Sequence, residues 1–375
     1  MLYYIWDLTC VTIGFLLFAP KWLTSGKQSN DGSPAKGKDM NNTSQLCRLS
    51  IIIPCRNEEA NLQLLLPLLK KQTLQSFEII VVDDSSEDRT ALIAAQHGTI
   101  VLCAPPLPKG WIGKSWACWN GAIAANGEFL LFLDADTRPA AAFVERLVSL
   151  LSNKEGLVTV QPSHAVPSFR EQCSAFFNLV ITAGSGAASA LPMQTDGFGP
   201  CAACVREQYF EIGGHEIVRE EMLEHLHLGK RFKEKGHTSK LLLGNQLLQF
   251  RMYPEGWRTL LQGWSKSIGL GAGSTPVGAL FLVILWFSGL VSSAVRMLAL
   301  AGSNQWLEWI AAAAIYALSV WTVSRGLNAS GSFKWYTKLF YPPYLVFFVA
   351  LFSYSVLLSF IVRKVSWRGR QINVP

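Results

Sequence analysis

The sequence predicts an α/β domain, with a mostly parallel sheet and helices on both faces, held by membrane segments at both ends of the chain. Short β-branched strands alternate with helices between residues 49 and 133, and two of those strands end in paired carboxylates. Long uncharged runs near both termini predict the membrane segments. Half of the 375 residues are hydrophobic and only 16% are charged, which is too apolar for an ordinary soluble enzyme.

Residues 1–22 are predicted to be a membrane anchor. Residues 8–20 are apolar, no Lys or Arg precedes them, and lysines follow at positions 21, 27, 36 and 38. A cleaved signal peptide carries its positive charge in front, so we expect a retained anchor with its N-terminus outside and the main domain in the cytoplasm. Residues 23–47, rich in Gly, Ser, Asn and Lys, are predicted to be a flexible linker.

Residues 48–253 are predicted to form the catalytic domain. Its first half is expected to contain strands at 49–54, 78–84, 100–103 and 129–133, separated by helices at 61–71, 87–97 and 115–126. No G-x-G-x-x-G follows the first strand, which instead continues as Pro54-Cys-Arg56-Asn57. A dinucleotide-binding fold of the usual kind is therefore not expected.

The stretch from Phe129 to Pro139 carries the main chemical signal. Five apolar residues, typical of a strand buried on both faces, are followed at once by Asp134 and Asp136. Ligands of open α/β sheets bind at the carboxyl ends of strands, and the following Thr-Arg-Pro predicts a turn that lets both carboxylates face one site. Two such ligands suit Mg²⁺ or Mn²⁺ holding a substrate diphosphate. The alternative is a strand terminator with two solvated carboxylates.

Four segments, in this order and spacing, resemble the family 2 glycosyltransferases, which have a GT-A fold. They are Ile51-Ile-Ile-Pro-Cys-Arg-Asn-Glu-Glu59, Val81-Val-Asp-Asp-Ser-Ser86, Leu133-Asp-Ala-Asp136, and a later segment with Gly197-Phe-Gly199-Pro200, Arg206 and Ile212-Gly213-Gly214. The resemblance implies a nucleotide sugar as donor, and an ion held by Asp136 with Asp134 against the ion or the ribose.

The same resemblance assigns the base pocket. It implies that Asp83 or Asp84 reads the uracil or ribose edge and that Pro54, Arg56 and Asn57 shape the pocket around the base. The alternative for the two carboxylates is a turn that caps the following helix.

The loop Lys109-Gly-Trp111-Ile-Gly113-Lys114 is predicted to close over the sugar diphosphate. It offers two cations and an aromatic ring, and its two glycines can act as hinges. The alternative is a solvated surface loop with Trp111 packed on the domain.

The general base is open on the sequence alone. The family usually shows Glu-Asp before a Leu-x-x-Arg-Leu helix, and Glu224-His225 takes that place here. Glu224 could act as the base, His225 could, or an acceptor that is already an ionised carboxylate could need none. Alternatively, Glu220, Glu221 and Glu224 are the charged face of a helix and the histidines are surface residues.

A narrower resemblance, to the 4,4'-diaponeurosporenoate glycosyltransferases, extends over nearly the whole chain. It is carried by the loop at 109–118 and by Val160-Gln-Pro162, Phe250-Arg-Met-Tyr253, Gln262-Gly-Trp264-Ser-Lys266 and Trp367-Arg-Gly-Arg-Gln371. It implies inverting transfer from UDP-glucose to a C30 carotenoid acid. Hopanoids, polyprenyl phosphate or diacylglycerol are alternative acceptors, and a non-catalytic membrane scaffold is the alternative from another class. The net charge of +7 is expected to serve contact with anionic lipid and not with nucleic acid.

Residues 254–273 are predicted to form an interfacial amphipathic helix that places Trp264 and Lys266 beside the substrate. Residues 274–375 are predicted to be transmembrane, with uncharged runs at 274–295, 309–324 (the marginal one) and 339–362. Three full crossings would put the basic C-terminus outside, so we expect two crossings and one interfacial or re-entrant segment in a multi-pass cell-membrane protein. The eight cysteines are expected to be reduced, and Cys201-Ala-Ala-Cys204 lacks the partners of a zinc site.

Overall fold

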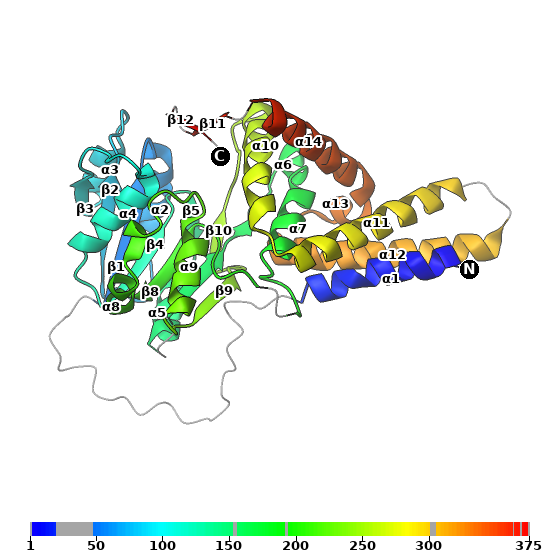
Figure 1. The fold of residues 1–375 in the computed structure, drawn as a ribbon, viewed down its shortest axis with the longest axis horizontal. Coiled ribbons are helices and arrows are strands. Elements are labelled where there is room, and N and C mark those ends of the chain that lie inside the picture. Colours follow the sequence, from blue (N-terminus) through cyan, green and yellow to red (C-terminus); the bar gives the residue numbers. More distant parts are fainter. Residues whose placement is uncertain are drawn as a thin grey trace, which may run out of the picture. The chain divides into compact units, whose positions relative to one another are not determined.

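The computed structural model describes residues 2–19, 48–152, 156–191, 194–300, 305–362, 364–367 and 370–373 (Figure 1). The chain forms two compact units. The sheet unit comprises the described parts of Lys21–Ser163 and Asp196–Phe250, and the apolar unit those of Met1–Pro20, His164–Thr195 and Arg251–Pro375. The predicted linker at 23–47 lies outside the described residues. The segment His164–Thr195, which the sequence analysis included in residues 48–253, clusters with the apolar unit.

The sheet unit is built on a seven-stranded sheet in the order β3-β2-β1-β4-β8-β6-β9. These strands are β1 (Leu49–Cys55), β2 (Phe77–Asp83), β3 (Ile100–Cys103), β4 (Phe129–Leu133), β6 (Leu157–Gln161), β8 (Cys201–Val205) and β9 (Ser239–Leu243). Pairing is parallel except that β8 runs antiparallel to both of its neighbours. The mostly parallel sheet predicted from the sequence is confirmed.

Helices cover both faces of this sheet. They are α2 (Glu59–Lys70), α3 (Thr90–Gln96), α4 (Gly113–Ala124), α5 (Phe143–Leu151), α8 (Arg206–Glu211) and α9 (Glu224–Glu234), with a 3₁₀ turn η1 (Gly214–Glu216). Ile51 and Ile53 of β1 pack into the core beneath α2 and α5, whereas Ile52 packs into the core beneath α4 and α9. Apolar side chains are needed on both sides, which explains the uninterrupted apolar runs in the sequence.

Beyond the main sheet, the chain turns after β4 into β5 (Thr137–Pro139), which pairs antiparallel with β10 (Leu248–Phe250). The two-residue strand β7 (Ser163–His164) follows β6. This arrangement fixes the backbone on both sides of Asp134 and Asp136.

The apolar unit is helical. Its helices are α1 (Leu2–Leu17), α6 (Phe169–Gln172), α7 (Ala175–Gly184), α10 (Trp257–Ser274), α11 (Val277–Ala299), α12 (Trp306–Ser330), α13 (Trp335–Leu339) and α14 (Tyr341–Val362); a hairpin of β11 (Lys364–Trp367) and β12 (Arg370–Asn373) follows.

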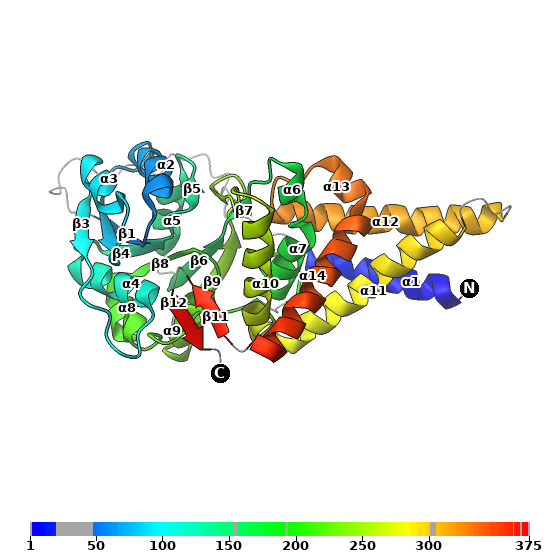
Figure 2. The ribbon, with the colours of Figure 1, turned by 90° about the horizontal axis from the view of Figure 1, so that it is seen from above.

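Three of these helices, α1, α11 and α12, lie alongside one another (Figures 1 and 2). Glycines allow the close approach: a Cβ at Gly14 would lie 2.6 Å from the Thr322 Cβ, and one at Gly289 would lie 2.7 Å from the Cys10 Cβ. Near the free end of α1, Arg296 Nε donates to Oδ2 of the buried Asp7 at 2.8 Å. The N-terminal helix is thus an integral part of the bundle.

Among the described residues, α11 and α12 are the two helices long and apolar enough to cross a membrane, judged by length and composition. The 309–324 run, marginal in the sequence, lies inside the 25-residue helix α12. Helix α1 is shorter, with 16 residues, and α14 comprises 22 uncharged residues.

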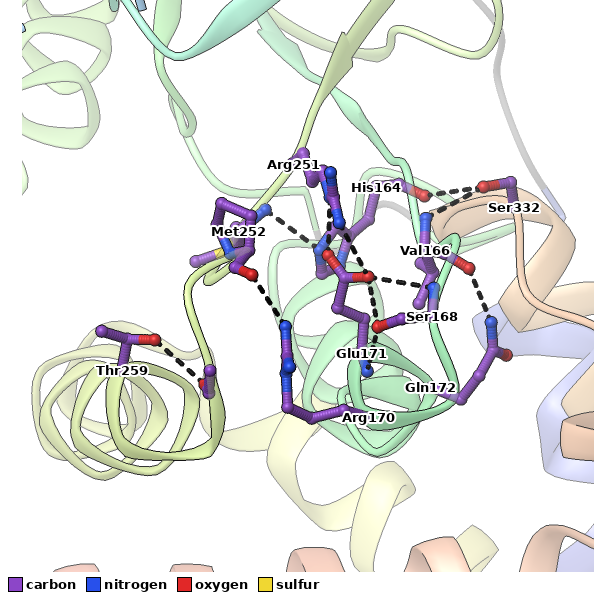
Figure 3. Close-up of polar contacts among 12 residues, drawn as sticks. His164, Val166, Ser168, Arg170, Glu171, Gln172, Arg251, Met252, Thr259 and Ser332 are labelled. Atoms are coloured by element: carbon purple, nitrogen blue, oxygen red, sulfur yellow. Dashed lines mark hydrogen bonds and ion pairs between the residues drawn. The ribbon is translucent and has the colours of Figure 1, made fainter. Parts of the chain in front are cut away.

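A polar network joins α6 to the segment that precedes α10 (Figure 3). The buried carboxylate of Glu171 accepts a 2.7 Å hydrogen bond from Arg251 Nε and a 2.5 Å bond from Ser168 Oγ, which also caps α6. Arg170 Nη2 donates to the Pro254 carbonyl at 2.8 Å. These contacts fix the start of α10 within the apolar unit.

Candidate active site

The carboxyl ends of β1, β2 and β4 lie side by side because these three strands are parallel neighbours. Pro54 and Cys55 therefore stand next to Val82 and Asp83, in register. The sheet brings together the segments at 54–57, 83–84 and 134–136 that the sequence singled out, at the edge where open α/β sheets bind their ligands.

Asp83 and Asp84 differ in their surroundings. Asp84 Oδ2 lies 3.7 Å from Arg56 Nη1, and the Asp84 amide donates to the Cys55 carbonyl at 2.8 Å. Asp83 is buried, and its Oδ1 accepts no hydrogen bond from the described residues. A buried carboxylate oxygen in this position suits a donor group of a ligand.

The alternative role of these carboxylates as a helix cap does not fit the structure. The next helix, α3, begins only at Thr90, and Asp88 accepts from the Thr90 amide at 2.9 Å. Asn57 instead joins the two strand ends: its amide donates to Ser86 Oγ at 2.9 Å, and its Oδ1 accepts from the Glu87 amide at 2.8 Å. This cross-link holds the predicted base-pocket backbone in place.

Asp134 and Asp136 lie on a turn, as the sequence predicts. The Thr137 amide and hydroxyl both donate to the Asp134 carbonyl, at 3.2 and 2.8 Å, which closes the turn between β4 and β5. Arg138 supports it from within by donating to the Ala135 carbonyl at 3.1 Å. Both carboxylates are partly exposed.

Lys114 contacts both the turn that carries Asp134 and the start of α9. It lies in the first turn of α4, and its Nζ is 2.9 and 3.0 Å from the two Asp134 oxygens and 2.8 Å from Glu224 Oε1. The lysine thus bridges the turn after β4 and the first residue of α9.

Glu224 and His225 are both buried, so the interpretation of them as surface residues is wrong. Helix α9 starts at Glu224 and packs its Leu228 and Phe232 into the core, which turns its first residues inward. His227, by contrast, is on the exposed side.

The tautomer of His225 follows from its partners. Nδ1 lies 2.7 Å from the Gly199 carbonyl oxygen, which can only accept, so Nδ1 carries the proton. Nε2 is then a proton acceptor; it is 3.8 Å from Glu224 Oε1 and makes no hydrogen bond with the described residues.

The charges of these groups support one another. Burial opposes the charge on Lys114, but Asp134 and Glu224 raise its pKa well above the ordinary value. Burial also opposes the charge on Glu224, yet the neighbouring Lys114 ammonium group outweighs burial and the pKa of Glu224 is lowered to about 2. Burial lowers the pKa of His225. At neutral pH the lysine and the glutamate are therefore ionised and the histidine is neutral.

Lys109 and Trp111 lie on the loop before α4. Trp111 packs edge-on against Trp116, with ring centroids 4.8 Å apart, and the Ile112 amide donates to the Arg219 carbonyl at 2.8 Å. In this structure the loop is seated on the domain, and Lys114 belongs to the helix that follows it.

The carboxylates fit a divalent ion. Within the described part of the chain, no three His, Cys, Asp or Glu side chains form a metal-binding group. Mg²⁺ or Mn²⁺ at a diphosphate needs only one or two protein carboxylates, because substrate oxygens and waters supply the other ligands. Asp136 and Asp134 are the two carboxylates of this turn that would hold such an ion.

Two functional neighbours were not predicted from the sequence. The Gly199 carbonyl orients His225, and a Cβ at Gly197 would lie only 2.2 Å from the His225 carbonyl oxygen. His215 is fully buried, accepts from or donates to the Tyr209 hydroxyl at 2.8 Å, and lies edge-on to His225 at 6.2 Å. The glycines of these motifs were the available signal, since they permit the close approach.

Trp264 and Lys266 belong to the apolar unit. Trp264 is buried, stacks on Phe177 at 4.7 Å and donates from Nε1 to Ser174 Oγ at 2.9 Å. Its visible role is to pack α10 against α7. The Lys266 side chain lies outside the described ones.

Comparisons with known proteins agree with this fold. The glycosyl transferase family 2 model matches residues 50–174. A relative from Staphylococcus haemolyticus (strain JCSC1435) is 33% identical over 288 residues, which cover 75% of this chain and 74% of the relative. Another from Staphylococcus aureus (strain USA300) is 32% identical over 334 residues, covering 87% and 88%. Both are named 4,4'-diaponeurosporenoate glycosyltransferase.

Among solved structures, a mannosyltransferase from Pyrobaculum calidifontis, in complex with GDP-Man and Mn²⁺, aligns with a TM-score of 0.50. The alignment covers 96% of this chain and 99% of that one at 17% sequence identity, so the likeness is one of fold. The family model and the names of the relatives favour a glycosyltransferase over a non-catalytic scaffold. The chain belongs to the family 2 glycosyltransferases and is a glycosyltransferase of the GT-A fold.

Proposed function

We propose that this glycosyltransferase moves glucose from UDP-glucose to the carboxylate of a C30 carotenoid acid, giving a glycosyl ester at the membrane. The names of relatives that are 32–33% identical over most of the chain support this acceptor. The long apolar helices α11 and α12 support work on a substrate that resides in the membrane.

The observation that carries the proposal is the environment of Glu224. A hydroxyl acceptor must lose a proton as it attacks, and the base should have a pKa near the working pH. Burial raises the pKa of Glu224, but the Lys114 ammonium group lowers it more, to about 2. This carboxylate is therefore a poor proton acceptor. A carboxylic acid acceptor is already ionised near neutral pH and needs no base.

In the proposed reaction, an oxygen of the acceptor carboxylate attacks C1 of glucose. The bond between C1 and the diphosphate oxygen breaks, UDP leaves with the electron pair, and the configuration at C1 inverts. No proton has to move. A divalent ion held by Asp136 and Asp134 would neutralise charge on the departing diphosphate.

The other residues at the carboxyl ends of β1 and β2, and those of the loop before α4, are proposed to bind and orient the donor. The Asp83 Oδ1, which has no hydrogen-bond partner among the described residues, supports recognition of a donor group on the uracil or ribose. The Asp84 carboxylate already forms an ion pair with Arg56, and this favours Asp83 over Asp84 for the contact with the donor. Lys109 and Trp111 are proposed to cover the sugar diphosphate when the loop moves.

One observation favours a second candidate, a hydroxyl-bearing lipid such as a hopanoid or diacylglycerol. The His225 Nε2 is an unprotonated acceptor with no hydrogen-bond partner in the described structure. Of the pair Glu224-His225, this nitrogen is the group that is free to accept a proton from a hydroxyl, because the Glu224 carboxylate is bound to Lys114.

A transfer assay separates the candidates. Purified full-length protein in detergent receives UDP-glucose, UDP-galactose or GDP-mannose together with a C30 carotenoid acid, the matching carotenoid alcohol, or a hopanoid. Mass spectrometry identifies the products. The proposal expects transfer of glucose from UDP-glucose to the acid. Transfer only to the alcohol or the hopanoid would replace the acceptor while keeping the enzyme class.

A further inference from the structure

The position of Lys114 has a consequence for metal binding. A single ammonium group makes three short contacts with two carboxylates that lie 90 residues apart: both Asp134 oxygens at 2.9 and 3.0 Å, and Glu224 Oε1 at 2.8 Å. The Lys114 side chain is 23% exposed, and those of Asp134 and Glu224 are 29% and 8% exposed. The three groups therefore interact in a partly dry environment, where such contacts are stronger than at an open surface.

These contacts use the oxygens that a divalent ion would need. A carboxylate that already neutralises an ammonium group with both oxygens offers less free charge to a metal, and two cations on one carboxylate repel each other. The Asp134–Lys114 contact must weaken before Asp134 can serve as a ligand.

We propose that Lys114 acts as an internal competitor of the divalent ion for Asp134, so that the protein binds metal weakly until a nucleoside diphosphate arrives. The diphosphate offers Lys114 another anionic partner and frees Asp134. Metal and nucleotide then each strengthen the binding of the other, as thermodynamic linkage requires. This inference rests on the proposed metal site.

Mn²⁺ binding to the full-length protein, followed by the electron paramagnetic resonance signal of free Mn²⁺, tests the proposal without relying on activity. Lys114→Met should bind Mn²⁺ at least about tenfold more tightly than the wild type in the absence of UDP, since hydrogen bonds to charged groups contribute on this scale. Adding UDP should strengthen Mn²⁺ binding in both proteins, because the diphosphate itself supplies metal ligands, and the factor should be clearly larger in the wild type than in the variant.

Matched variants separate this effect from a general loss of positive charge. Lys230→Met removes the same charge from the exposed side of α9 and should leave Mn²⁺ affinity within about twofold of the wild type. Because Lys114→Met leaves the buried Glu224 without its cation, the double variant Lys114→Met/Glu224→Gln is measured as well. It removes both charges, and it should show the same gain. Adding Asp134→Asn should abolish that gain.

Unchanged or weaker Mn²⁺ binding in both the single and the double variant, with measurable binding in the wild type, would overturn the competition. An equal gain in Lys230→Met would also overturn it. Absence of Mn²⁺ binding in every variant, with and without UDP, would remove the metal site itself and with it this part of the proposed function.

Discussion

Single residues at the carboxyl ends of the strands owe their charge and protonation state to the side chains and carbonyl groups that they contact. Lys114 keeps Glu224 ionised, Gly199 sets the tautomer of His225, and Arg56 engages Asp84. The chemistry that each side chain can perform follows from these contacts more than from its residue type.

Asp136→Asn is expected to keep the fold and to lower transfer by orders of magnitude. The amide keeps the size of the side chain but cannot neutralise a divalent ion, and removing one group that stabilises charge in a transition state typically costs about 100- to 1000-fold. Initial rates of glucose transfer from UDP-glucose measure this loss of activity. Glu207→Gln, which removes an exposed carboxylate at the start of α8, is the control. Near-wild-type turnover, or full activity in a chelator, would take the ion out of the mechanism.

Glu224→Gln and His225→Ala are expected to lower turnover only modestly if the acceptor is a carboxylic acid. Neither side chain then removes a proton in the transition state, and what is lost is positioning. A general base typically contributes about 100- to 10,000-fold. A loss of kcat on that scale in either variant would point to a hydroxyl acceptor.

The sequence predicted Asp134, Asp136, Asp83 and Glu224 as site residues because each stands at an element end in a recognisable motif. It could not predict that Lys114 joins Asp134 to Glu224. That contact depends on the directions of α4 and α9 over the sheet, which no local pattern of residues encodes. Likewise, the burial of Glu224 and His225 follows from the packing of Phe232 and Leu228 further along α9.

At the scale of elements, most of the catalytic half could be read from the sequence. Helix α2 and strands β1 to β4 lie within a few residues of their predicted positions, because apolar runs and polar ends mark them. Helix α3 is shorter than predicted and begins at Thr90. The Glu87 amide donates to Asn57 and the Thr90 amide donates to Asp88, so residues 87–89 form a turn instead of the first turn of the helix. Local side-chain hydrogen bonds of this kind compete with helix.

The contact between α6 and Arg251 gives a prediction about stability. Glu171 is buried; burial opposes its charge, but Arg251 and Ser168 lower its pKa. A carboxylate with a lowered pKa stabilises the fold above its unfolded pKa, about 4.3, and this contribution is lost as the pH falls through the lower folded value. Glu171→Gln should therefore lower the thermal unfolding midpoint at pH 7, and the difference from the wild type should shrink towards pH 3.

Thermal unfolding in detergent, followed at pH 7, 5, 4 and 3, measures this dependence. Glu308→Gln alters an exposed carboxylate at the start of α12 and serves as the matched control. A difference between Glu171→Gln and the wild type that stays constant over this pH range would show that the carboxylate charge does not contribute.

At the scale of the whole molecule, the apolar unit gives a prediction about topology. Helices α11 and α12 can cross the membrane as a pair, and α14, which carries Pro342-Pro343 in its first turn, is the segment expected to stay interfacial or re-entrant. With the anchor's flanking lysines inside, two crossings return the chain to the cytoplasm and leave the basic residues 363–370 there.

A cysteine added at the C-terminus tests this topology. A membrane-impermeant thiol reagent should fail to label it in intact cells and should label it after permeabilisation. Ser303→Cys, between α11 and α12, is the positive control for external labelling. Labelling of the C-terminal cysteine in intact cells would require a third crossing.

The direct test of the central claim is the linkage in the product. Purified protein is incubated with UDP-glucose and a lipid extract that contains both a C30 carotenoid acid and hydroxyl-bearing lipids, and the glycosylated product is isolated and treated with mild alkali. A glycosyl ester should release glucose and the free acid, as carboxylate transfer predicts. A glycolipid that keeps its sugar in alkali, as the sole product, would contradict the carotenoid-acid acceptor and leave a glycosyltransferase that acts on a hydroxyl.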